Sequence, residues 1–408
     1  MNPARRRPAV MQRGVTGRRH RPDYMLLVLS AILLVIGVVV IYSISPGLAM
    51  QRNVSENYYV NKQLLAIALG IITFIAMATI PYGTWRKLQK PLIVVAVIAT
   101  IIALALPVSE QYPAHRWIRF GGLSFQSVEL VKFAFIFVFA GFLADRIKHG
   151  EVNDVDRSLK PIGIAFAITA FAIAVLQSDL GSTGVLTAIL VAMWFVAGLS
   201  FKRLIMLAGI AVLLFFIAVG TSEYRRDRFA TFMNPTQDCQ SAGYQACQAL
   251  IAVGTGGLFG KGIGHSVQAY GYLPEAANDS IFAVLAEKFG FIGVTALLVV
   301  FWAFFTRLKN IIERVPDDFS RLVVVGILAW LSTQAIINIG AMIGLLPLKG
   351  ITLPFISYGG TSIIFVTAAV GLVFNISRYT TYGVHEGTEP RVPAPANRRY
   401  SLGYSTRR

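Results

Sequence analysis

The residues of this chain best suited to chemistry are charged side chains that lie within or beside long apolar runs. Residues 273–293 read LPEAANDSIFAVLAEKFGFIG, with Asp279 opening the apolar part and Glu287 and Lys288 inside it. A charged group at the centre of a bilayer costs at least ~2–3 kcal/mol. Taken alone, Asp279 is equally suited to capping a helix. We interpret Glu287 and Lys288, roughly 12 Å further along the helix, as a polar pair in helix packing.

A second polar stretch, residues 115–132, reads HRWIRFGGLSFQSVELVK. Arg116 and Trp117 stand in a loop before a helix that contains Glu129 and Lys132. These last two are three residues apart and therefore neighbours on one helical face. They are either a functional pair or a buried ion pair that only neutralises itself.

Two further polar segments join apolar runs. The segment QSDLGSTG, residues 177–184, places Asp179 in a tight turn, where Asp and Gly are also ordinary turn residues. Residues 338–362 contain Pro347, Pro354 and several Gly, which is typical of a broken or re-entrant segment. Such backbone is tolerated at membrane depth only where protein or a wet cavity surrounds it. We expect all these segments and Asp279 to line one outward-facing cavity that suits an anionic substrate.

Membrane helices must position these residues. Of the 408 residues 55% are hydrophobic and only 14% charged, against about 25% charged in soluble domains. Runs of roughly 18 apolar residues predict membrane-spanning helices, and the fold class is therefore all-α and polytopic. Ten spans are predicted, at residues 24–44, 63–80, 92–108, 126–145, 161–176, 181–199, 202–221, 279–305, 322–343 and 361–376. An even number places both termini on the same side.

The net charge of +17 follows membrane topology. Seven Arg precede residue 24, six stand from residue 378 onward, and the turns on the same side bring this total to 26 of the 37 Lys and Arg. This is the positive-inside pattern, which places both termini in the cytoplasm. The basic tails then lie beside anionic lipid, and no nucleic-acid partner is expected.

One loop, residues 222–278, is long and faces outward. Loops of this length without a domain of their own are usually functional. Its run GTGGLFGKGIG does not fit a Walker motif, because Thr255 and Gly262 occupy the required Gly and Ser/Thr places; we interpret it as flexible backbone on the membrane surface. The only two cysteines, Cys239 and Cys247, lie in this loop, where a disulfide can persist.

In these motifs the chain resembles the SEDS proteins, the family of RodA and FtsW. The matches are RWI at 116–118 with QSVELVK, QSDLGS at 177–182, NP at 234–235, GGLFGKG, YLPEAAND and GLLPLKGITLPFISYGG; LKGITLP is more similar to FtsW than to RodA. The chain departs from the family at Ser127 and Val128, where QPSE is usual, and at Ser178, where Pro is usual; Ala277 replaces a common His. Asp279 is then left to transfer a proton without that His.

The resemblance implies a peptidoglycan glycosyltransferase that polymerises lipid II, a disaccharide-pentapeptide on undecaprenyl diphosphate, at the outer face of the bacterial cytoplasmic membrane. A sugar 4-hydroxyl is a poor nucleophile at neutral pH, so a carboxylate must serve as general base, and Asp279 is the candidate. The diphosphate leaving group needs cations rather than a proton, and direct displacement inverts the anomeric centre. The expected substrate-binding residues are Arg116, Trp117, Glu129, Lys132, Asp179, Arg226, Lys261, Glu275, Asn278, Lys349 and Ser357.

No cofactor follows with certainty, although a divalent ion such as Mg²⁺ or Mn²⁺ would help Arg116 and Lys132 to hold the diphosphate. The resemblance also implies a class B penicillin-binding protein and other division proteins as partners, and a place at the division septum. The expected units are a basic cytoplasmic tail (1–23), a membrane domain (24–379) and a disordered basic tail (380–408). A lipid II flippase, whose polar groups would lie near mid-membrane, and a division scaffold are the alternatives.

Overall fold

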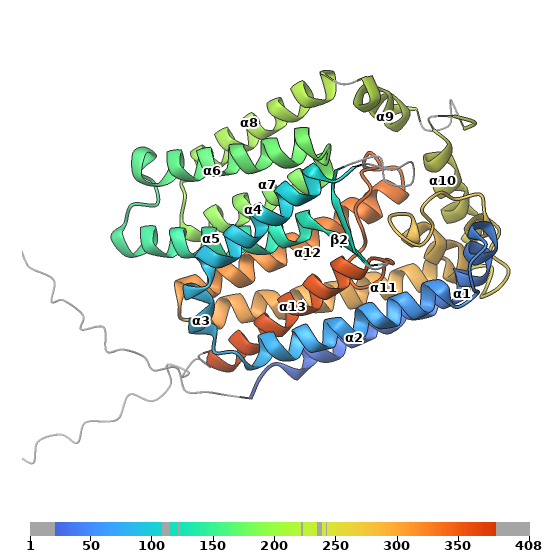
Figure 1. The fold of residues 1–408 in the computed structure, drawn as a ribbon, viewed down its shortest axis with the longest axis horizontal. Helices are drawn as coiled ribbons and strands as arrows, with labels where there is room; N and C mark the ends of the chain where they lie inside the picture. The colour runs from blue at the N-terminus through green and yellow to red at the C-terminus, as the bar shows by residue number, and fades with distance from the viewer. Residues whose placement is uncertain are drawn as a thin grey trace, which may run out of the picture.

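Helices that lie side by side along one long axis make up most of the molecule (Figure 1). The computed structural model describes residues 21–107, 115–120, 123–221, 223–234, 239–241 and 243–380. Predictions made for residues 1–20 and 381–408, which form nearly all of both tails, fall outside these ranges.

The elements follow the predicted apolar runs closely. Their bounds are α1 Tyr24–Arg52, α2 Tyr58–Thr79, α3 Tyr82–Lys87, α4 Gln89–Ala105, β1 Trp117–Phe120, β2 Leu123–Gln126, α5 Ser127–His149, η1 Val155–Leu159, α6 Lys160–Phe171, η2 Ala172–Leu176, α7 Leu180–Ala197, α8 Phe201–Gly220, α9 Glu223–Met233, α10 Tyr244–Gly256, η3 Gln268–Tyr270, α11 Ile281–Arg314, α12 Asp318–Met342, α13 Gly360–Ile376 and η4 Ser377–Tyr379.

The prediction of an all-α polytopic membrane fold is confirmed. Among the described residues, nine helical segments are long and apolar enough to cross a membrane, and α4 is a shorter apolar helix. Together they coincide with the ten predicted spans. β1 and β2 form a small antiparallel hairpin that places Trp117 opposite Gln126.

The polar residues are carried by the inner helices of the bundle. α5, α12 and α13 are mostly buried, whereas η1–η2 and α8 keep most of their apolar surface exposed. The exposed side chains of α8, which include Leu213, Leu214 and Phe216, are therefore the surface that suits lipid.

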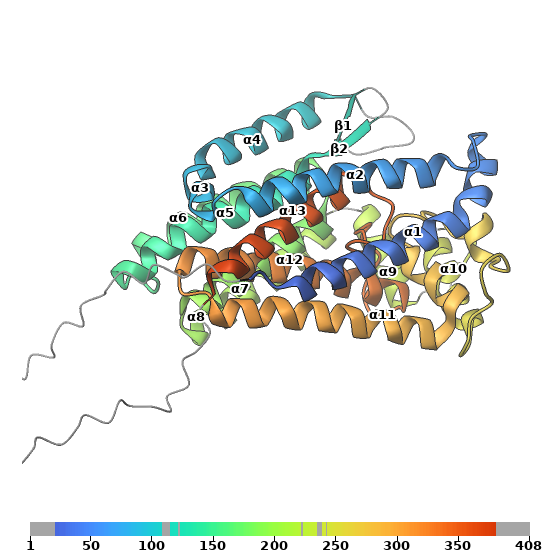
Figure 2. The same ribbon diagram turned by 90° about the horizontal axis from the view of Figure 1, so that it is seen from below.

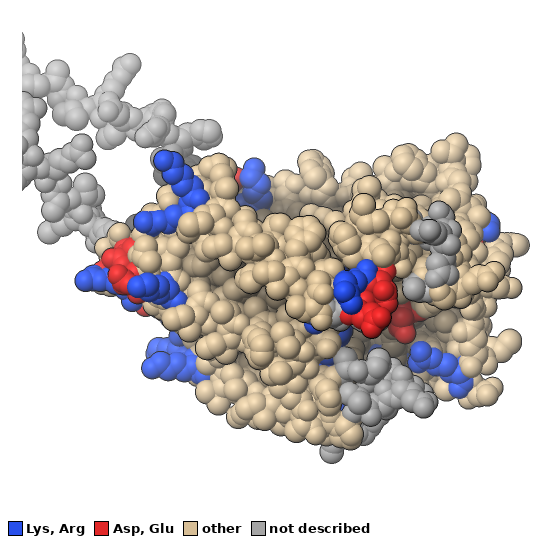
Figure 3. Space-filling model, turned by 90° about the horizontal axis from the view of Figure 1, so that it is seen from above, with Lys and Arg blue, Asp and Glu red and all other residues tan. Residues whose placement is uncertain are grey.

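The two described chain ends lie together at one end of the bundle. The backbone N–H of Asp23 donates a hydrogen bond to Ser377 Oγ at 3.0 Å, and the Asp23 carboxylate caps α1 through Met25 N and Leu26 N. This contact agrees with the even number of predicted spans. Lys and Arg side chains gather at the left end of the face drawn in Figure 3.

The prediction of one continuous helix around Glu287 and Lys288 is wrong. α11 is broken at Gly290, whose φ of 63° and ψ of −165° are not helical. Its first arm, residues 281–288, is buried on all sides, whereas Phe291 and Ile292 just after the break are exposed. Residues 291–314 alone reach roughly 35 Å, which is enough to span a bilayer. Both charges therefore precede the membrane-spanning arm.

The glycine run is packed against this break rather than lying free on the membrane surface. Lys261 N–H donates to Glu287 O at 2.8 Å, and Phe291 N–H donates to Gly257 O at 2.8 Å. A side chain at Gly290 would begin only 2.3 Å from Gly260 N, so both the positive φ and the close approach require glycine there. In Figure 2, α11 runs along the lower edge with α10 beside its right-hand end.

Glu287 and Lys288 do not form the polar pair that we expected. Glu287 accepts hydrogen bonds from Ser266 Oγ and from the backbone N–H of Val267 at 2.9 Å, and it pairs with Lys261 Nζ at 3.3 Å. Lys288 Nζ lies 5.1 Å from the centroid of the Tyr270 ring. The two charges thus hold the loop that leads to Asp279 against α11.

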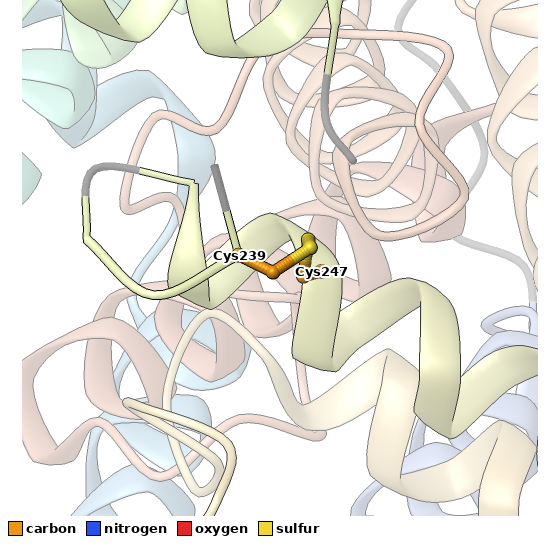
Figure 4. Close-up of a disulfide and its surroundings, with 2 residues drawn as sticks. All are labelled: Cys239 and Cys247. Atoms are coloured by element: carbon orange, nitrogen blue, oxygen red, sulfur yellow. A yellow bond between two sulfur atoms is a disulfide. The ribbon is translucent and has the colours of Figure 1, made fainter. Parts of the chain in front are cut away.

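The predicted disulfide between Cys239 and Cys247 is present (Figure 4). The Cα atoms are 5.5 Å apart, and Cys247 lies in the first turn of α10, where its side chain is buried. α10 packs against α11 so closely that a side chain at Gly256 would begin 2.1 Å from Ala286 O. The disulfide therefore fixes the start of a helix that adjoins the Asp279 segment.

Candidate active site

Asp279 is held at the start of α11 by its backbone, which leaves its carboxylate available. Asn338, on α12, donates through Nδ2 to Asp279 O and to Ile351 O, both at 2.7 Å. The Asp279 side chain is only 9% exposed, and its Oδ1 has no hydrogen-bond partner among the described residues. A buried polar atom without a partner is costly, so this oxygen is a candidate for contact with substrate.

Asp279 does not cap α11, as it would if its role were only structural. The cap position is Ser280, which makes no side-chain cap hydrogen bond. Among the described residues, no helix N–H donates a hydrogen bond to the Asp279 carboxylate. The helix-cap interpretation of this residue is therefore not supported.

The surroundings of Asp279 raise its pKa to about 7. Burial is the largest cause, because it disfavours the charged form, and the negative charge of Glu275 adds to it. The backbone N–H of Asp279, the guanidinium of Arg228 and the amide of Gln245 oppose the rise. A carboxyl with a pKa near the working pH is well suited to accept and release a proton.

The broken segment between α12 and α13 forms one wall beside Asp279. Ser357 Oγ donates to Asn278 O at 2.6 Å, and Tyr358 N–H donates to Ala277 O at 2.8 Å. A side chain at Gly350 would begin 3.7 Å from Oδ2 of Asp279. The predicted site residues Ser357 and Asn278 are therefore brought together with Asp279.

Lys349 brings a positive charge to the same wall. Burial lowers its pKa most, followed by the charges of Arg228 and Arg225, while Asp179 raises it. Its Nζ lies 5.4 Å from the ring centroid of Phe215, on α8. Lys349 and Arg228 are thus neighbouring cations, of which Arg228 also acts on Asp279, and such groups favour a bound anion.

Arg116 fastens the turn that contains Asp179. Its guanidinium donates to Gln177 O at 2.9 Å and to Ser178 O at 2.6 Å, and it lies 3.7 Å from Asp179 Oδ2. Asp179 also caps α7 through Ser182 N at 2.9 Å. Arg116 and Asp179 are therefore brought together as an anchor for this turn.

A close backbone contact joins that turn to the wall. A side chain at Gly181 would begin 3.1 Å from Lys349 O. The segments that carry Asp179, Lys349 and Asp279 are thus in contact with one another.

Glu129 and Lys132 form the predicted ion pair, at 2.8 Å, but deep within the bundle. Both side chains are buried, and Lys132 Nζ lies 5.1 Å from the ring centroid of Trp330, on α12. Nearby, Gln177 Nε2 donates to Ser127 Oγ at 2.9 Å and ties α5 to the Asp179 turn. The position of Lys132 does not support direct contact with a diphosphate, but it fits a role in positioning α5.

Three other predicted residues do not join this group. Lys261 is engaged with Glu287 at the broken end of α11. Arg226 is exposed on α9, whereas its neighbour Arg228 donates to Leu348 O at 3.3 Å. Trp117 is half-buried in the hairpin.

Sequence reasoning missed two residues that act on the site. Asn338 is an amide in an apolar run, and its polarity was a usable signal, but Asp279 is remote from it in sequence. Gln245 donates through Nε2 to Ser280 Oγ at 3.1 Å, and only the fold brings α10 to that point. It also lines a small hollow with Arg228, Phe232 and Leu348.

No group of three or more His, Cys, Asp or Glu side chains gathers as a metal site within the described ranges. Mg²⁺ commonly binds through one or two carboxylates together with substrate phosphates, a mode that Asp279 and Glu275 fit. Bound there, such an ion would neutralise diphosphate charge.

Comparison with known proteins places the chain in a family. The profile of the FtsW, RodA and SpoVE family, described as "Cell cycle protein", matches residues 24–382. The chain belongs to this family. The SEDS resemblance drawn from the motifs is thus confirmed.

Relatives of this SEDS protein cover nearly its whole length. Stage V sporulation protein E of Bacillus subtilis (strain 168) is 37% identical over 370 residues, which are 90% of this chain and 100% of the relative. The "Probable peptidoglycan glycosyltransferase FtsW" of Saccharophagus degradans is 36% identical over 361 residues, 88% of this chain and 92% of the relative. Both sporulation and FtsW names thus occur among similar relatives.

Solved structures share the fold of this SEDS protein. A chain from a study of "polymerization and crosslinking by a peptidoglycan synthase complex" superposes with a TM-score of 0.71 at 25% identity, covering 88% of this chain and 98% of the other. RodA of Thermus thermophilus superposes with a TM-score of 0.62 at 23% identity, covering 89% of this chain and 98% of RodA. The RodA likeness concerns the fold alone.

Proposed function

We propose that this SEDS protein is a peptidoglycan glycosyltransferase that polymerises lipid II, with Asp279 as general base. The observation that carries the proposal is the Asp279 carboxylate itself. It is buried, unpaired at Oδ1, held in place through its backbone and poised at a pKa of about 7 beside cationic side chains. The relatives named as glycosyltransferases support the same reaction.

The reaction needs one base and one stabilised leaving group. The Asp279 carboxylate takes the proton of a sugar 4-hydroxyl. As the proton leaves, the oxygen of that hydroxyl forms a bond to the anomeric carbon of a second sugar. The bond from that carbon to the diphosphate oxygen breaks, and undecaprenyl diphosphate leaves with the electron pair. A single displacement of this kind inverts the anomeric centre.

Lys349 and Arg228 hold the departing diphosphate. Arg228 acts on Asp279, Lys349 precedes Gly350, which lies against Asp279 Oδ2, and the repulsion between the two cations contributes to the lowered pKa of Lys349. A diphosphate between them would relieve that repulsion and neutralise its own developing charge. Arg116 donates to the carbonyls of Gln177 and Ser178 and stabilises the turn that contacts the Lys349 segment.

The site faces the outside of the cytoplasmic membrane. Asp279 precedes α11, Asp179 precedes α7, and residues 343–359 join the end of α12 to the start of α13. These ends lie opposite the end where α1 begins and η4 finishes. With both termini in the cytoplasm, as the positive-inside pattern predicts, Asp279 lies outside.

The position of the polar groups favours an enzyme over a lipid II flippase. A flippase needs polar groups near mid-membrane that are reached from each side in turn, whereas Arg116, Asp179, Lys349 and Asp279 gather at one end. A scaffold role leaves the unpaired Asp279 carboxylate unexplained. We propose a division role beside a class B penicillin-binding protein at the septum, supported by the FtsW-like LKGITLP motif.

Reconstitution of the purified full chain with lipid II tests this function. We expect glycan polymer to accumulate, measured by gel electrophoresis of labelled product. Transfer of lipid II between leaflets of a vesicle without polymer would instead identify a flippase, and would overturn the proposal.

A further inference from the structure

Two large apolar side chains of the glycine run, Leu258 and Phe259, face outward from the protein. Their exposed fractions are 63% and 79%. Phe291 and Ile292, the first side chains after the break in α11, are exposed as well. Exposed apolar side chains that gather in one place mark a contact with another protein or with a membrane.

Main-chain hydrogen bonds place Leu258 and Phe259 at the level where the membrane-spanning arm of α11 begins. Phe291 N–H donates to Gly257 O at 2.8 Å, and Ile292 N–H donates to Leu258 O at 3.1 Å. The two pairs of exposed apolar residues therefore lie on adjoining segments of backbone. The surface of the glycine run continues the surface that the spanning arm presents to lipid.

The length of the spanning arm indicates where this level lies in the bilayer. Residues 291–306 contain no charged side chain, and they rise about 24 Å along a helix. The hydrocarbon core of a bilayer is about 30 Å thick, and a tilted helix covers less of it still. With Arg307 near the opposite edge, the break at Gly290 lies at the outer edge of the core or just inside it.

The backbone of the glycine run is hydrogen-bonded as this depth requires. Lys261 N–H donates to Glu287 O at 2.8 Å, and Gly262 N–H donates to Lys288 O at 2.9 Å. In an unbroken helix these carbonyls would accept from the residues four further along, but those N–H groups donate to the glycine run instead. Irregular backbone at membrane depth is tolerated only where its polar groups are satisfied within the protein, and the pairing across the break satisfies them.

We propose that residues 257–260 dip into the outer leaflet and place Leu258 and Phe259 among its acyl chains. Lys261 is the only charged residue of the GTGGLFGKGIG run, and its Nζ reaches back to Glu287 at 3.3 Å. The tip of the loop is therefore uncharged as well as apolar, which favours lipid over water. The loop is a fixed insertion into the leaflet rather than flexible backbone on its surface.

The inserted loop is linked to the active-site segment through α11. The buried arm, residues 281–288, leads from the neighbour of Asp279 to the break at Gly290. Contact with lipid at the break therefore fixes the depth of Asp279 relative to the outer leaflet. The inference does not depend on the proposed reaction, because it rests on apolar exposure and on backbone pairing alone.

Spin labelling of the full chain in phosphatidylcholine vesicles tests the insertion. Phe259→Cys and Leu258→Cys are each labelled with a thiol-reactive nitroxide, whereas Cys239 and Cys247 are joined in a disulfide, so the unsubstituted protein serves as the blank. Electron paramagnetic resonance then compares access of oxygen, which concentrates among acyl chains, with access of a nickel chelate, which stays in water. We expect oxygen but not nickel to reach both labels, at a depth of roughly 5–10 Å.

Two further labelled variants calibrate the depth. Leu213→Cys, on the exposed apolar surface of α8, should lie deeper, and Glu56→Cys, exposed in the loop after α1, should be reached by nickel. Labels at 258 and 259 that nickel reaches as readily as the label at 56 would place the loop in water and overturn the proposal. Labels that neither reagent reaches would show that protein, such as a second copy of the chain, covers the loop, and would overturn it too.

The outcome does not depend on a variant that fails to fold. Leu258 and Phe259 are both exposed, so replacing either of them should leave the midpoint of thermal unfolding in detergent unchanged. The label is read only in protein that meets this condition, and either position alone is sufficient for the test.

Discussion

At the residue scale, the reactivity of Asp279 depends on how its two ionisation states are balanced. Burial and Glu275 favour the protonated acid, whereas its own N–H, Arg228 and Gln245 favour the carboxylate. A base must be ionised to act, so the rate of polymerisation should rise with pH and level off above about 7. Initial rates measured from pH 5 to pH 9 check this rise.

Glu275→Gln should shift the rise in polymerisation rate to lower pH, because it removes the negative charge that disfavours ionised Asp279. The amide of Gln can still accept the hydrogen bond that Asn278 Nδ2 donates to Glu275. Glu223→Gln, at an exposed carboxylate on α9, serves as the control. If the polymerisation rates of the Glu275→Gln and wild-type proteins rise over the same pH range, Glu275 does not affect the ionisation of Asp279.

The raised pKa of Asp279 in the folded protein also makes stability depend on pH. The folded pKa of Asp279 lies above its ordinary value of 3.8, so the folded state binds this proton more tightly than the unfolded state does. The contribution of Asp279 to stability is therefore fully present below pH ~4 and is lost as pH rises to about 7. An ionised Asp279 makes the folded protein less stable, which is typical of a residue retained for function.

At the element scale, Glu287 is the point at which the loop before Asp279 is fastened to α11. Replacing it with Ala would leave the Val267 and Gln268 N–H groups and Lys261 without their acceptor. We expect Glu287→Ala to lower the free energy of unfolding by about 2–4 kcal/mol, measured by thermal unfolding in detergent. Glu313→Ala, at an exposed i,i+4 pair with Lys309, should change it by less than about 0.5 kcal/mol. Equal effects of the two replacements would rule out the fastening role.

The buried pair on α5 gives a second element-scale prediction. Lys132→Met leaves the Glu129 charge buried without its partner and should destabilise by about 3–5 kcal/mol. Glu129→Gln combined with Lys132→Met should recover most of that stability. Polymerisation should remain low in the double variant, because the ion pair orients the turn of α5 that bonds Gln177 through Ser127. Recovery of both properties would show that the pair only packs.

Sequence reasoning succeeded where a local pattern determines the structure. Long apolar runs located the spans, and a cysteine pair in an outward-facing loop located the disulfide. It failed at Gly290, because the apolar run continues on both sides of the break and only the packing of Gly260 against it requires the break. It also missed Asn338 and Gln245, whose partners Asp279, Ile351 and Ser280 lie in segments between helices.

At the scale of the whole molecule, the proposed function requires the end of the bundle that carries Asp279 to face outward. The charge pattern predicts that the loop with Cys239 and Cys247 is extracytoplasmic. In intact cells, a membrane-impermeant maleimide should label Cys239, which is partly exposed, only after an impermeant reductant has been added. Labelling without reductant would contradict the disulfide. Labelling that requires permeabilised cells would contradict the topology.

The molecule therefore combines a lipid-facing shell with a polar site at one end of an apolar bundle. α8 and η1–η2 expose apolar side chains, while α5, α12 and α13 form the interior that supports the wall beside Asp279. Two of the buried charges are offset by their neighbours: Lys132 pairs with Glu129, and Glu287 accepts several hydrogen bonds. The Asp279 carboxylate keeps an oxygen, Oδ1, that has no hydrogen-bond partner among the described residues and is available to substrate.

The most direct test of the central claim is lipid II polymerisation by Asp279→Asn. Asn is similar in size and cannot accept the hydroxyl proton, so the rate should fall by about 10²-fold or more. The variant should be at least as stable as wild type at pH 8, because it removes a buried charge and no cap hydrogen bond. A polymerisation rate equal to that of the wild-type protein would show that Asp279 is not the base.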